Sequence, residues 1–77
     1  MGPTMDANIA ATTIKFCLSR IREDLAQAAS IAKAANACFE AGHPQKAIEV
    51  ALDIEQLIYE ARTLLNAASL LNRIGET

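Results

Sequence analysis

Apolar residues recur at alternating intervals of four and three along most of this chain. One series occupies the first half and another the second, and the segment Ala41-Gly42-His43-Pro44 separates them. This spacing keeps side chains on one side of a helix, and a long series is typical of helices that pack at a shallow angle. Glycine suits the left-handed residue that ends a helix, and proline suits the first turn of the next. We therefore predict an all-α fold in which two helices form a long antiparallel hairpin.

The hairpin is expected to be a single domain covering residues 1–77. Its helices are predicted at about 7–41 and 44–74, with a turn at 42–43 and flexible residues at 1–6. We expect the two main apolar series to face each other along the hairpin. They consist of Ile14, Leu18, Ile21, Leu25, Ala28, Ala32, Ala35 and Phe39 before the turn, and of Ala47, Ala51, Ile54, Ile58, Ala61, Leu65 and Ala68 after it.

A second apolar stripe runs beside each of these series. A short chain buries only a modest share of its surface, and apolar faces this wide belong to helices with two neighbours. We therefore expect a dimer that completes a four-helix bundle, or the same surface covered by a helix of another protein. The predicted interface consists of Cys17, Ile31, Cys38, Val50, Leu57, Leu64 and Leu71, a series interrupted by Asp24.

Some apolar residues lie outside both stripes. They are either scattered surface residues, a docking groove for a partner, or a surface covered by the N-terminal segment. As candidate partner-binding residues we name Phe16, Ile48, Leu52, Tyr59 and Leu70.

The sequence offers few groups for catalysis or metal binding. The one histidine, His43, falls in the turn, where capping or solvation is its expected role. The two cysteines and the histidine do not have the spacing of a zinc site. Acid–base and nucleophilic catalysis need a poised group with an orienting neighbour. We expect no enzymatic activity, no cofactor and no metal.

Charge and cysteine content suggest the environment of the chain. The net charge is −2, and the basic residues are scattered among acids, which argues against a nucleic-acid interface. No apolar run is long enough to span a membrane. Cys17 and Cys38 would lie about 31 Å apart on one helix, too far for a disulfide, so we expect reduced thiols and a cytoplasmic protein.

These observations favour a protein–protein interaction module, homodimeric and with a structural or regulatory role. The alternative is a small adaptor or co-chaperone whose apolar face binds another protein's helix. In architecture the expected hairpin is similar to the small co-chaperones of bacterial type III secretion, which hold a helical partner on one apolar face. It is also similar to the RNA-binding hairpin dimers of the Rop type, which makes a nucleic-acid-binding dimer the third hypothesis.

Overall fold

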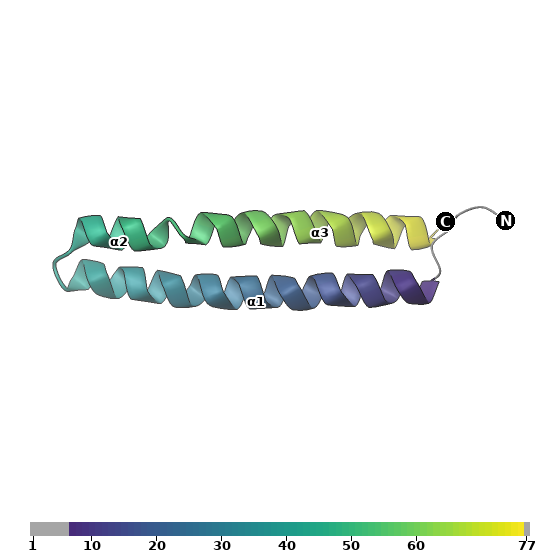
Figure 1. Cartoon of the computed structure of the whole chain (residues 1–77), viewed down its shortest axis with the longest axis horizontal. Coiled ribbons are helices and arrows are strands. Elements are labelled where there is room, and N and C mark those ends of the chain that lie inside the picture. The colour runs from purple at the N-terminus through teal and green to yellow at the C-terminus, as the bar shows by residue number, and fades with distance from the viewer. Residues whose placement is uncertain (1–6, 77) are drawn as a thin grey trace.

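Three helices make up the described part of the protein. The computed structural model describes the backbone of residues 7–76 and the side chains of 8–75, so the flexibility predicted for residues 1–6 lies outside the described residues. Helix α1 spans Ala7–Glu40, α2 spans Pro44–Ala51 and α3 spans Ile54–Glu76. α2 and α3 run back along α1 and together form the second arm of the hairpin (Figure 1). The predicted all-α hairpin is confirmed.

The turn between the arms follows from its glycine and proline. Gly42 has a φ of 90°, in the left-handed region where a side chain would be strained. Its N–H donates to the carbonyl of Phe39, and the N–H of His43 donates to that of Cys38, both at 3.0 Å. These bonds form a Schellman motif, which ends α1 by satisfying its last carbonyls. Pro44 then opens α2, while the side chain of His43 is exposed and makes no cap hydrogen bond.

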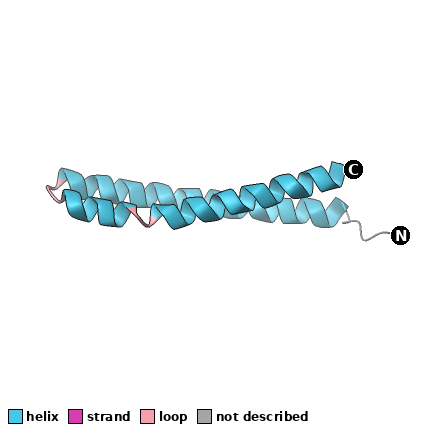
Figure 2. Cartoon of the chain, turned by 90° about the horizontal axis from the view of Figure 1, so that it is seen from above, coloured by secondary structure: helices cyan, strands magenta, loops and turns pink. Residues whose placement is uncertain are grey.

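The second arm is bent, whereas the sequence predicted one continuous helix over 44–74. The break falls at Leu52 and Asp53, between α2 and α3 (Figure 2). There the N–H of Asp53 donates to the carbonyl of Val50, only three residues back, at 3.3 Å. Such a bond tightens the helix locally. Aspartate is also a residue type that begins helices, and Asp53 directly precedes α3.

Side-chain burial shows which side of each arm faces the other. In a lone hairpin the opposite arm is the main cover for a side chain, so buried and half-buried residues mark the contact. Most of them recur at intervals of four and three on both arms, and we call this line of contact the seam. Thr13, Ala51, Glu60 and Ala67 are also half-buried and lie at its edges. Its residues are Ala10, Ile14, Cys17, Ile21, Asp24, Ala28, Ile31, Ala35 and Cys38 on α1, and Ala47, Val50, Ile54, Leu57, Ala61, Leu64, Ala68 and Leu71 on the second arm.

The seam differs from the predicted contact line by a rotation of each helix. Leu18, Leu25 and Phe39, expected between the arms, are about half exposed, and Ile58 and Leu65 are exposed in the same way. The prediction that they face the opposite arm is wrong. Neighbouring stripes on a helix lie 40–60° apart. Each helix is therefore turned about its own axis by about 50° from the predicted orientation, which brings the neighbouring stripe into the contact.

Small residues explain why this side of each helix faces inward. The buried apolar residues of the seam are all alanine or cysteine, which lets the two helix axes approach closely. They are Ala10, Cys17, Ala28, Ala35, Ala47, Ala61 and Ala68. The same choice makes the core thin, since no large side chain among the described residues is fully buried.

Enlarging a buried alanine of the seam should therefore destabilise the hairpin. We expect Ala28→Leu or Ala35→Leu to lower the free energy of unfolding by about 1–3 kcal/mol, because the added atoms push the arms apart. The matched control is Ala26→Leu, on the exposed side of α1, which should change it by less than about 0.5 kcal/mol. Urea titrations at one fixed protein concentration measure the difference. Equal stability of the three variants would contradict the observed seam.

Candidate interaction surface

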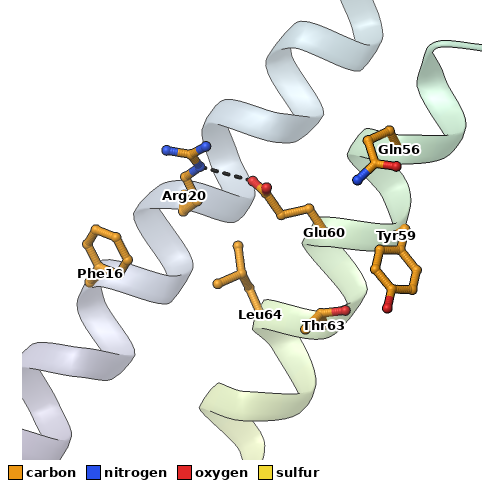
Figure 3. Close-up of a pocket in the computed structure, with 7 residues that line it drawn as sticks. All are labelled: Phe16, Arg20, Gln56, Tyr59, Glu60, Thr63 and Leu64. Atoms are coloured by element: carbon orange, nitrogen blue, oxygen red, sulfur yellow. Dashed lines mark hydrogen bonds and ion pairs between the residues drawn. The ribbon is translucent and has the colours of Figure 1, made fainter.

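A charged interaction crosses the hairpin on one flank of the seam. Arg20 on α1 directly precedes Ile21, and Glu60 on α3 directly precedes Ala61. The Arg20 Nε–H donates to Glu60 Oε1 at 3.0 Å, joining two residues that lie 40 positions apart (Figure 3). In an antiparallel pair, residues that precede corresponding seam positions share one flank. This hydrogen bond therefore identifies the charged flank of the hairpin.

The opposite flank has an exposed apolar surface. It is formed by apolar residues that directly follow a seam residue, as Leu18 follows Cys17 on α1 and Ile58 follows Leu57 on α3. Other residues that follow a seam residue are charged, namely Lys15, Arg22, Glu55 and Arg62. The large apolar side chains on this surface have exposed fractions of 43–58%. We call this surface the apolar face, and it consists of Leu18, Leu25, Ala32, Phe39, Ala51, Ile58 and Leu65.

Asp24 is the one polar residue that the seam buries among the described residues. It is 3% exposed, and its Oδ2 atom is buried without a hydrogen-bond partner in the described part of the chain. Its Oδ1 lies 3.9 Å from Arg20 Nε, so the guanidinium partly compensates the charge. The sequence did contain a signal, because Asp24 occupies a place in the Cys17, Ile31 and Cys38 series. We interpreted it as an interruption, whereas it marks a buried position.

The carboxyl groups of Asp24 and Glu60 have pKa values shifted in opposite directions. Burial raises the pKa of Asp24, and the nearby Glu60 carboxylate raises it further by accepting a hydrogen bond from the protonated form. The pKa of Glu60 is lowered by that same hydrogen bond and by the one from Arg20. Asp24 therefore takes up a proton before Glu60 does when the pH falls.

A shallow groove lies on the charged flank, beside the Arg20–Glu60 pair. Its volume is about 300 Å³, and α1 and α3 both contribute to its walls (Figure 3). Two of the candidate partner-binding residues, Phe16 and Tyr59, line it. The structure leaves the other three, Ile48, Leu52 and Leu70, exposed at separate places outside this groove. The groove therefore brings together only two of the five candidate partner-binding residues.

The predicted interface residues all lie in the seam. Cys17 is buried, while Ile31, Cys38, Val50, Leu57, Leu64 and Leu71 are half-buried against the opposite arm. Both thiols are free, as the sequence predicted. The residues of the apolar face, predicted to lie inside the hairpin, are instead available to a second chain, as are the exposed side chains of Phe16, Ile48, Leu52, Tyr59 and Leu70.

The described residues contain no group of three histidine, cysteine, aspartate or glutamate side chains placed to hold a metal ion. Within the same part of the chain, no helix combines the length and apolarity needed to cross a membrane. No protein-family model matches the chain, and neither a curated protein nor a solved structure is significantly similar to it.

Neutralising Asp24 should stabilise the protein at neutral pH. A raised pKa means that the folded state binds the proton more tightly, so this contribution to stability is complete below the unfolded pKa and is lost as the pH rises through the folded pKa. The lowered pKa of Glu60 acts in the opposite way, because its contribution is lost as the pH falls through the folded value. We expect Asp24→Asn to raise the melting temperature at pH 7, and the gain to shrink as the pH falls toward 4.

The control for this substitution is Glu23→Gln, at the exposed acid next to Asp24. It removes the same formal charge but should show no such pH-dependent gain. Melting curves between pH 4 and 8 measure both variants. A destabilised Asp24→Asn protein at pH 7 would mean that the Arg20 ion pair outweighs the cost of burying the carboxylate.

Proposed function

We propose that this chain is a non-enzymatic protein–protein interaction module that associates with a second copy of itself to complete a four-helix bundle. The observation that carries the proposal is the apolar face, on which Leu18, Leu25, Phe39, Ile58 and Leu65 line up on one flank while all remain about half exposed. Scattered surface hydrophobes need no explanation, but an aligned set on both arms is typical of a contact surface.

The free energy gained by burying the apolar face would be large for so small a protein. Burying the exposed halves of these five side chains would contribute roughly 4–7 kcal/mol before the costs of association. A typical domain has a total stability of about 5–15 kcal/mol. Because no large side chain of the seam is fully buried, the hairpin has little other apolar burial to depend on. Assembly would thus supply a substantial share of the stability of the fold.

The alternative occupant is a helix of another protein, as in an adaptor or co-chaperone. A single helix lying between the two arms would cover the apolar face and give a three-helix bundle. Glu55 and Arg62 line a groove together with Ala51 and Ile58 of the face, so one acidic and one basic side chain adjoin it. The mass of the purified chain distinguishes the two occupants.

We expect the purified chain to sediment at twice its mass of 8.2 kDa and to melt at a temperature that rises with concentration. The double variant Leu25→Asp/Ile58→Asp should abolish the dimer, because two carboxylates per chain would be buried in an apolar interface. The matched control is Leu70→Asp, an equally exposed leucine outside the apolar face, which should leave the mass unchanged.

Two results would contradict the homodimer. One is a parent chain that stays monomeric, with a melting temperature independent of concentration. The other is a double variant that keeps the parent's mass. Because the double variant can also unfold when it dissociates, circular dichroism accompanies sedimentation, and the concentration dependence of the parent provides the independent test.

A further inference from the structure

Charge is divided unevenly along the hairpin. The segments that include the termini, residues 1–27 and 58–77, have five basic and five acidic side chains, a net charge of zero. The half that contains the turn, residues 28–57, has two basic and four acidic side chains, a net charge of −2 with His43 neutral. The negative net charge of the chain therefore falls in the half that contains the turn.

We infer that the second copy lies antiparallel across the apolar face, with its turn beside the termini of the first. This inference rests on the proposed homodimer and specifies its arrangement. A parallel arrangement would place the two negative halves side by side, whereas the antiparallel one places each negative half beside a neutral one. Individual surface ion pairs are weak, but bringing surfaces of like charge together is unfavourable and disfavours the parallel alignment.

The apolar residues of α1 support the antiparallel arrangement independently of charge. A two-fold axis that lies in the interface, perpendicular to the long axis of the hairpin, places α1 against the α1 of the other copy. Leu25 is the middle residue of its stripe and would meet the Leu25 of the other copy. Leu18 would then face Ala32, and Phe39 would face exposed Ala11 at the far end of the stripe. Large side chains meet small ones on both sides of the axis, which keeps the helix separation nearly constant.

The second arm has the same symmetry centre. Residues 61–62 lie midway between Ile58 and Leu65, so the Ile58 of one copy would face the Leu65 of the other. Leu25 lies 17 residues before Gly42, and residues 61–62 lie 19–20 after it, which places both centres at one level to within about one helical turn. One axis can therefore satisfy both arms.

Disulfide trapping tests the arrangement in the full chain. The background carries Cys17→Ala and Cys38→Ala, which removes both native thiols. In it, Leu25→Cys should form covalent dimers under mild oxidation, because the two Cα atoms lie close to the axis and within disulfide reach. The matched control, Phe39→Cys, should not crosslink to itself, because the two copies of residue 39 would lie about 40 Å apart.

A mixed sample provides a second measurement. Chains with Ala11→Cys and chains with Phe39→Cys should crosslink to each other but not to themselves. Sedimentation of each reduced variant first establishes that it is dimeric. A monomeric thiol-free chain would refute the proposed homodimer itself. A dimeric chain in which Leu25→Cys and Phe39→Cys crosslink to themselves with equal yield, and the mixed sample does not crosslink, would overturn only the antiparallel arrangement.

Discussion

Each arm of this hairpin has one neighbour, and that limit governs the rest of the structure. A helix with a single neighbour buries one narrow stripe, whereas both arms have apolar side chains across a wider arc. Among the described residues, the apolar side chains that are fully buried belong to alanine and cysteine, while the leucines and isoleucines of the seam are half-buried. Further large side chains, among them Leu18, Leu25 and Phe39, are left exposed on one flank. The two helices approach closely, and as a result none of the large side chains described between them is fully buried. The apolar face is the direct result of that choice.

The two flanks of the seam therefore have different physical characters. The charged flank has a hydrogen bond between the arms, from Arg20 to Glu60, together with a shallow groove. The apolar face has aligned, exposed large side chains from both arms, with Glu55 and Arg62 beside it. The groove on the charged flank is lined in part by Phe16 and Tyr59, so the flanks differ in the alignment of their apolar side chains and in the interaction between the arms. The proposed module uses this difference to bind through one surface only.

Asp24 is the one described position of the seam at which a charged group is buried, which destabilises the hairpin. Its carboxyl group lies near the middle of the rod, where the proposed two-fold axis would cross on the other flank, and only Arg20 compensates its charge. A buried acid with a raised pKa weakens the hairpin at neutral pH, and the proposed association would offset that loss. Buried polar residues in helical bundles also help to set register, because a shifted alignment would bury the charge without Arg20 and Glu60.

The sequence by itself determined the helical hairpin and its turn. The alternation of four and three requires helices, and the left-handed Gly42 followed by Pro44 requires a reversal at one place. Only the tertiary structure decided which stripe of each helix faces the other, and hence that Leu25 is exposed and Asp24 is buried. Periodicity defines a helix but not its rotation about its own axis when three adjacent stripes are all largely apolar. That rotation depends on how closely small side chains let the arms approach and on the Arg20–Glu60 bond between residues far apart in sequence.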